Sequence, residues 1–303
     1  MKRVLSNLAC VVCLFAITGV SLAEEPKPKP EVSLTGVAVS TGREGGSYYY
    51  IGQRLNSEML LAHNQLIEVV TSDGSLDNLA RLHDPRSPVN VALAQADALK
   101  SYLKSEPGFA GKFFVLGDVG KECVLLVAGA SSSVKSTADL KAQGSRQLSV
   151  DSPGSGAAVT FETMGALDPG FRNTATVYVP TMESLLQLRV GGEYSELKAL
   201  MMVQRPRRVS PALKVVLSDP KSYKLLPITA RDLPNDALPD GSKIYSFESV
   251  AVGGVKRRGH QQLDTVCTRG LLLGSIPKLS RAQRSTLSEL MLNAGERIAG
   301  SDE

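Results

Sequence analysis

Residues 37–51 read VAVSTGREGGSYYYI, a stretch that passes from apolar residues through a glycine-rich segment to aromatic residues. Its first three residues predict a short strand, and the Gly- and Ser-rich residues 40–47 predict a turn. From Tyr48 to His63 apolar residues recur every three or four positions, which predicts one buried face of a helix. A strand that passes through a glycine-rich turn into a helix is typical of a largely parallel α/β sheet.

The same pattern continues on both sides of the chain's midpoint. Strands are predicted over 67–70 and 89–93, with a helix over 75–82 between them. In the second half, a strand over 147–150 runs into DSPGSG at 151–156 and then into a helix over 157–167. We therefore predict an α/β fold with two similar lobes and a cleft between them.

Composition excludes several classes of protein. The chain has 303 residues, of which 43% are hydrophobic and 21% are charged, enough apolar material for a packed core. A disordered chain, a coiled coil and a collagen-like fibre are therefore excluded. The formal net charge of +4 is too small to favour nucleic acid binding.

The N-terminus has the pattern of a secretory signal peptide. Met1-Lys2-Arg3 is followed by an apolar run from Leu8 to Val20, and Ser21-Leu22-Ala23 resembles a cleavage site. We expect export to the periplasm of a Gram-negative cell. A lipid anchor at Cys10 is the disfavoured alternative, because the apolar stretch before it is short. Residues 24–33, which begin EEPKPKPE, then predict an extended spacer.

The two glycine-rich turns are the candidate binding elements. Backbone N–H groups at a helix N-terminus attract carboxylate, phosphate or sulfate, and glycine lets a ligand approach the backbone. Neither turn is a dinucleotide fingerprint or a phosphate-binding P-loop. Loops that merely turn the chain are the alternative, although two of them at matching places favour a site.

Catalysis and metal binding have little support in the sequence. After the leader the only histidines are His63, His83 and His260, each predicted at the surface, and no nucleophile elbow or zinc motif occurs. We expect no enzyme activity, no metal and no cofactor. The basic residues 205–208 either receive an acidic partner or form a solvated loop, and the latter is favoured.

Residues 40–52 (STGREGGSYYYIG) resemble the opening motif of the TAXI family, the solute-binding subunits of TRAP transporters. Residues 71–82 (TSDGSLDNLARL), 91–98 (VALAQADA) and 140–156, ending DSPGSG, resemble further segments of that family in the correct order. The charges of Arg43 and Glu44 and the segment 191–208 depart from the family pattern. The resemblance covers about half of the predicted mature chain.

The resemblance implies a type II periplasmic-binding-protein fold, in which two α/β lobes joined by two hinge crossings enclose a ligand. The expected division of the chain is a signal peptide at 1–23, a spacer at 24–33, lobe 1 at 34–128 plus 248–303, and lobe 2 at 129–247. The implied ligand-binding residues are Thr41, Ser47, Tyr48, Ser75, Gln95, Gly154, Ser155 and Gly156, and we add Arg43, which departs from the family pattern, as a further candidate.

The implied function is to bind a small carboxylate, such as an amino acid or a dicarboxylic or keto acid, and to deliver it to a membrane permease. The alternative is a sensor or adaptor of the same fold that acts on a protein partner without transport.

Cys123 and Cys267 each lie in an apolar, strand-like run. Their residue patterns leave open a disulfide or two buried thiols. The implied fold brings the crossing strands side by side near both residues, so we expect a disulfide that stiffens the hinge.

Overall fold

The computed structural model describes residues 32–142, 147–191, 196–228, 236–253 and 261–300. The predicted signal peptide (1–23), most of the predicted spacer and His260 lie outside the described residues. From Val32 onward the chain forms one compact unit.

A single mixed sheet runs through the described residues. Its strands are β1 (Ala38–Ser40), β2 (Glu68–Val70), β3 (Val91–Gln95), β4 (Phe113–Gly129), β5 (Gln147–Ser149), β6 (Ala175–Val177), β7 (Leu197–Gln204), β8 (Tyr223–Leu226), β9 (Tyr245–Val252) and β10 (Gln261–Ser275). Their order is β2-β1-β3-β10-β4-β7-β5-β6, while β8 pairs with β4 and β9 with β10. The parallel pairs β1–β2 and β1–β3 confirm the predicted β-α-β-α-β opening.

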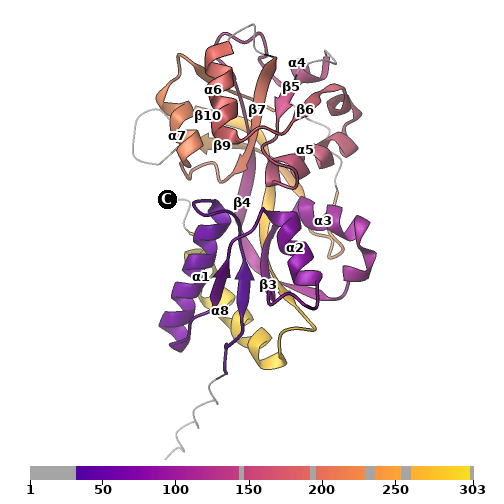
Figure 1. The fold of residues 1–303 in the computed structure, drawn as a ribbon, viewed down its shortest axis with the longest axis vertical. Helices are drawn as coiled ribbons and strands as arrows, with labels where there is room; N and C mark the ends of the chain where they lie inside the picture. The colour runs from indigo at the N-terminus through magenta and orange to yellow at the C-terminus, as the bar shows by residue number, and fades with distance from the viewer. Residues whose placement is uncertain (1–31, 143–146, 192–195, 229–235, 254–260, 301–303) are drawn as a thin grey trace, which may run out of the picture. The chain divides into compact units, whose positions relative to one another are not determined.

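The helices gather around the two ends of this sheet (Figure 1). The first lobe contains α1 (Ser47–His63), α2 (Ser75–His83), α3 (Ala96–Ser105) and α8 (Arg281–Ala299). The second lobe contains α4 (Thr137–Ala142), α5 (Gly156–Leu167), α6 (Thr181–Gly191) and α7 (Pro211–Ser218). Short 3₁₀ turns at Pro107–Phe109 and Pro169–Asn173 follow α3 and α5.

Separate apolar clusters form the cores of the lobes. In the first lobe α1 and α8 pack on the sheet through Ile51, Leu55 and Leu287, all fully buried. In the second lobe Phe161 and Met164 of α5 join a cluster with residues of β4, β5 and β7. The spacing of three or four that predicted the first helix corresponds to this buried face.

Strands β4 and β10 are long because each passes from one lobe to the other. The apolar runs 113–116 and 123–127, distinct in the sequence, belong to the single strand β4. β4 pairs antiparallel with β10, and this register places Cys123 opposite Cys267. The structure joins these two residues in a disulfide, across 144 positions of sequence.

Residues 236–244 return to the first lobe. Leu238 and Ile244 join the apolar cluster of α2 and α3, and Asp236 forms an ion pair with Lys100 of α3. Val252 and Leu263, on β9 and β10, instead pack with the second lobe. The exact lobe boundaries expected from the sequence stay a prediction.

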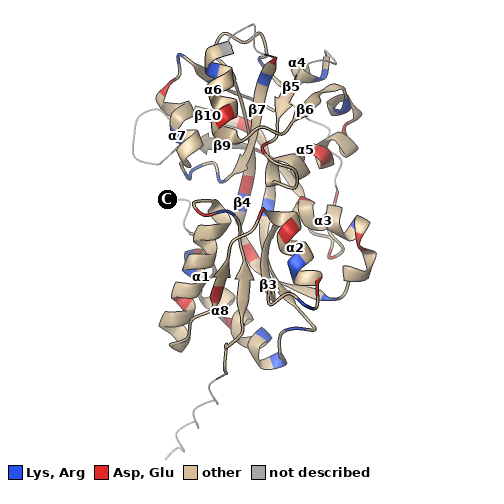
Figure 2. Ribbon diagram, viewed as in Figure 1, with Lys and Arg blue, Asp and Glu red and all other residues tan. Residues whose placement is uncertain are grey.

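Charged residues of both signs are scattered over both lobes (Figure 2). Such mixing agrees with the small net charge of the sequence. Among the described residues, no helix is long and apolar enough to cross a membrane.

Candidate ligand-binding cleft

A cavity of about 730 Å³ lies where the two glycine-rich turns meet the crossing strands. Its lining comes from both lobes: residues 42–48 before and at the start of α1, Gly74 and Ser75 of α2, Gln95 and Glu122, and residues 155–157, 180–182, 201–204 and 208–212. This volume lies within the range of small-molecule sites.

The first glycine-rich turn leads directly into α1. Gly46 is the N-cap residue, and no side chain caps the helix. Gly45 has a φ of 80°, a backbone conformation that a side chain would strain. The turn and the N-terminus of α1 therefore lie at the cavity wall, and their role as an anion-binding element stays a prediction.

The second turn has the same design but a different cap. Ser155 Oγ accepts a hydrogen bond from the N–H of Ala158 at 3.2 Å, which caps α5, and donates to the carbonyl of Val150 at 2.8 Å. The Ser155 hydroxyl therefore stabilises the start of α5 and also lines the cavity. Gly156 is needed for close approach, because a Cβ there would lie 2.6 Å from Gln95 Oε1.

Arg43 connects the two turns across the cavity mouth. Its Nη2 donates to Ser152 Oγ of the second lobe at 3.2 Å and forms an exposed ion pair with Asp73 at 3.5 Å. The start of α2 also lies close to the second turn, since a Cβ on Gly74 would lie 3.4 Å from the carbonyl oxygen of Gly154. Arg43 therefore stands at the entrance, in a position to contact an anionic ligand.

Several polar atoms on the cavity wall are buried and lack a partner. Within the described residues, no hydrogen bond satisfies Gln95 Oε1, Gln204 Nε2 or Arg208 Nη1, and all three residues line the cavity. A buried polar group without a partner costs free energy. A polar ligand in the cavity would supply the missing partners.

Glu122 is an acid on the cavity wall, and its side chain is almost fully buried. Burial raises the pKa of Glu122 to about 7, and the charge of Arg205 is the largest opposing influence. Burial also raises the pKa of Tyr48 well above its ordinary value, and the neighbouring Glu122 adds to that increase. The cavity thus contains an acid that titrates near neutral pH.

The second lobe contributes Gln204 and Arg208 from the end of β7. The guanidinium of Arg208 lies 4.1 Å from the centre of the Tyr50 ring. Burial lowers the pKa of Arg208, as do the positive charges of Arg54 and Arg205. Arg208 is a partly desolvated cation with an unpartnered N–H group, which suits an anionic ligand.

The structure brings together most of the residues named from the sequence. The lining includes Arg43, Ser47, Tyr48, Ser75, Gln95, Ser155 and Gly156. Thr41 is fully buried, and its hydroxyl donates to the carbonyl of Val70 at 3.0 Å. Neither Thr41 nor Gly154 is among the lining residues.

Sequence reasoning missed Glu122, Gln204 and Arg208. Glu122 is hidden within an apolar strand, and its position depends on how β4 crosses between the lobes. The basic stretch 205–208 was a usable signal, but a solvated loop was favoured for it. That interpretation is wrong for Arg205, which is 4% exposed and donates to the carbonyl of Ala299 at the end of α8.

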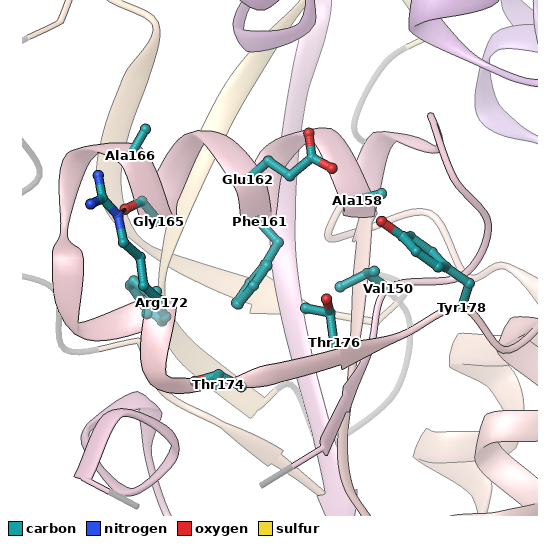
Figure 3. Close-up of a pocket in the computed structure, with 11 residues that line it drawn as sticks. Val150, Ala158, Phe161, Glu162, Gly165, Ala166, Arg172, Thr174, Thr176 and Tyr178 are labelled. Atoms are coloured by element: carbon teal, nitrogen blue, oxygen red, sulfur yellow. Dashed lines mark hydrogen bonds between the residues drawn. The ribbon is translucent and has the colours of Figure 1, made fainter. Parts of the chain in front are cut away.

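A second cavity, of about 410 Å³, lies between α5 and the segment 171–178, which includes β6 (Figure 3). Phe161, Arg172 and Tyr178 are among its lining residues. None of its lining residues is among the described residues with a buried polar atom that lacks a partner. Arg172 Nε donates to the carbonyl of Gly165 at 3.1 Å, and Thr174 Oγ1 to that of Leu140 at 3.1 Å. We therefore place the candidate site in the larger cavity.

The next question is whether the described residues could form a metal site. Within the described ranges, no group of His, Cys, Asp and Glu is arranged to hold a metal ion. His83, predicted at the surface, lies beside Tyr102, with 3.2 Å between Nδ1 and the phenolic oxygen.

Solved structures share the fold of this chain. A periplasmic thiamin-binding protein is 12% identical with a TM-score of 0.52, and covers 88% of this chain and 78% of its own. MatC from Rhodopseudomonas palustris with bound malate is 16% identical with a TM-score of 0.51, and the match covers 88% of this chain and 85% of MatC. XAC2383 from Xanthomonas citri bound to ATP is 11% identical with a TM-score of 0.50, and the match covers 88% of this chain and 87% of XAC2383.

Identities this low show the fold alone, and that fold is the predicted two-lobed α/β architecture of periplasmic binding proteins. No curated protein of similar sequence matches the chain. The sequence model of the NMT1-like family, however, matches residues 39–191, about half of the chain, including both glycine-rich turns. The chain belongs to the NMT1-like family.

Proposed function

We propose that this protein is the periplasmic solute-binding subunit of a TRAP-type transporter of the TAXI kind. It binds a small carboxylate in the cleft between its lobes and delivers the ligand to a membrane permease. The observation that carries the proposal is the set of buried polar atoms without partners on the cavity wall, next to two helix N-termini. A carboxylate satisfies Arg208 and Gln204 and lies beside both turns.

Closure of the lobes completes the site. Arg43 and Gly74 from the first lobe already approach Ser152 and Gly154 of the second. A ligand that contacts both turns favours the closed arrangement, because its contacts with both lobes exist only there. Binding without catalysis is the role that we assign to the cleft.

Titration calorimetry on the chain from Glu24 onward tests this proposal. The panel contains amino acids, dicarboxylic acids and keto acids, with thiamin as a cation that the site should reject. We expect at least one carboxylate to bind, and Arg208→Gln to weaken it by about tenfold or more, since it removes a charged donor. Silence across the panel would overturn the proposal.

A sensor or adaptor role is the second candidate, and one surface feature favours it. Met182, Leu186 and Val190 form an apolar stripe on α6, each more than half exposed. They recur every four residues and so share one helix face. Co-purification from periplasm with and without ligand separates the two roles: recovery of permease subunits supports transport, and a non-permease partner supports the alternative.

A further inference from the structure

Glu122 stands where both crossing strands and both lobes meet. It lies on β4, opposite Thr268 of β10 in the strand register. Two residues farther back, Gly120 has a φ of 103°, and a Cβ there would lie 3.1 Å from the Arg205 guanidinium. The chain thus keeps room for Arg205 next to a buried acid on the cavity wall.

The groups that face Glu122 come from every element packed around it. Tyr48 belongs to α1, Gln95 ends β3, Asp97 belongs to α3, and Arg205 follows β7; their charges or hydrogen-bonding groups influence its pKa. No ion pair of the Glu122 carboxylate exists among the described residues. Arg205 Nη1 instead donates a hydrogen bond to the carbonyl of Ala299.

The cavity wall therefore offers two kinds of polar group. Gln204 Nε2 and Arg208 Nη1 are donors without acceptors, and a ligand carboxylate satisfies them. Gln95 Oε1 is an acceptor without a donor, and the ionised Glu122 carboxylate is an acceptor as well. A carboxylate has no proton to offer to this second pair.

We propose that Glu122, together with Gln95, makes the cleft specific for carboxylates that also carry a hydrogen-bond donor, an ammonium or a hydroxyl group. This inference rests on the proposed function. A second carboxylate beside Glu122 meets a like charge and leaves Gln95 Oε1 unpaired, so plain mono- and dicarboxylates bind weakly.

Protonation of Glu122 makes the ligand affinity depend on pH. The pKa of Glu122 is about 7 because the side chain is buried. An ammonium group attracts the ionised form, so its affinity rises with pH through this range. A ligand that carries only carboxylates shows the opposite trend, since it favours the protonated form.

Matched ligand pairs test the inference: alanine and lactate against propionate, aspartate against succinate, and glutamate against glutarate. Calorimetry on the wild-type chain from Glu24 should show about tenfold or greater preference for the donor-bearing member of any pair that binds. The affinity of an ammonium-bearing ligand should rise from about pH 6 to about pH 8. In Glu122→Gln the preference and the pH trend should both disappear.

Glu289→Gln removes the same charge from an exposed position on α8, outside the cavity lining, and should leave the preference unchanged. Equal binding of the two members of a pair by the wild type would overturn the inference and leave the proposed function standing. A folded Glu122→Gln that keeps the preference would do the same. If no member of any pair binds, the inference fails, and if the keto acids of the panel are silent as well, the proposed function fails with it. The wild-type preference and pH trend decide the matter even if the variant does not fold.

Discussion

Asp97 and Thr160 join the two lobes by a buried hydrogen bond of 2.7 Å between Thr160 Oγ1 and Asp97 Oδ2. Asp97 belongs to α3 of the first lobe and Thr160 to α5 of the second. The same carboxylate oxygen accepts a bond of 2.8 Å from the Tyr245 hydroxyl. Both side-chain oxygens of this link are fully withdrawn from water, so its loss is costly.

Thr160→Val should therefore destabilise the protein by roughly 1.5–3 kcal/mol, the usual value of a hydrogen bond to a charged group. Burial already raises the pKa of Asp97, and the Thr160 bond holds it down. Chemical denaturation measures the change. Ser57→Ala on α1 is the control, because that exposed hydroxyl donates to the carbonyl of Gln53 within its own helix. Equal stabilities of the two variants would contradict the prediction.

Gly156→Ala tests the close approach of the second turn to the first lobe. The new Cβ would lie 2.6 Å from Gln95 Oε1, so either α5 or the amide must move. We expect a loss of about 1–3 kcal/mol in stability, as for overpacking of a core, together with weaker ligand binding. Gly108→Ala, where a Cβ meets nothing within 4 Å, should change neither quantity. If Gly156→Ala bound the ligand as tightly as the wild type does, the turn would have space for a Cβ and the prediction would be wrong.

Stability should fall as pH rises through the range in which Glu122 ionises. The unfolded chain releases this proton near pH 4.5 and the folded chain near 7, so between these values the folded chain binds more protons. At about pH 8 the buried charge costs up to roughly 3 kcal/mol, and Asp97 shifts in the same direction. Glu122→Gln should remove most of this pH dependence in urea denaturation, whereas a wild-type curve that rises from pH 5 to 8 would contradict it.

The Cys123–Cys267 disulfide predicts a simple chemical result. The chain from Glu24 onward, unfolded without reductant, should show no reactive thiol, and two after reduction. The Cys123→Ser, Cys267→Ser double variant should lose about 2–4 kcal/mol, the typical contribution of a disulfide that closes a long loop. Two reactive thiols before reduction would refute the disulfide. Cys10 and Cys13 belong to the predicted leader and are absent from this chain.

Local periodicity was enough to predict the α/β units. The apolar spacing over 48–63 predicted the α1 helix within one residue of its observed start. Such a prediction is possible because the buried face of a helix appears as a regular spacing of apolar residues along the sequence. The glycine-rich turns were found for the same reason. Seven of the residues named for the site line the cavity. Five of them lie in or directly after the glycine-rich turns, whereas Ser75 and Gln95 were named from the family resemblance.

Thr41 marks the limit of that reasoning within the first turn. Its hydroxyl was expected to face a ligand but bonds to Val70. Gly52 accommodates it, since a Cβ there would lie 2.4 Å from Thr41 Cγ2. A hydroxyl in a turn reaches either a ligand or a neighbouring strand, and only the packing of α1 against β2 selects between them.

The sequence by itself determined the repeated strand–turn–helix units, the two glycine-rich turns and the absence of a catalytic or zinc motif, because each of these is a local pattern. Only the tertiary structure decided that Glu122, Gln204 and Arg208 share a cavity with those turns. Glu122 is 82 positions from Gln204 in the sequence, and the antiparallel pairing of β4 with β7 brings their strands together. Burial then gives the acid a pKa near neutrality, and burial is a property of the packed lobes that no single stretch of residues contains.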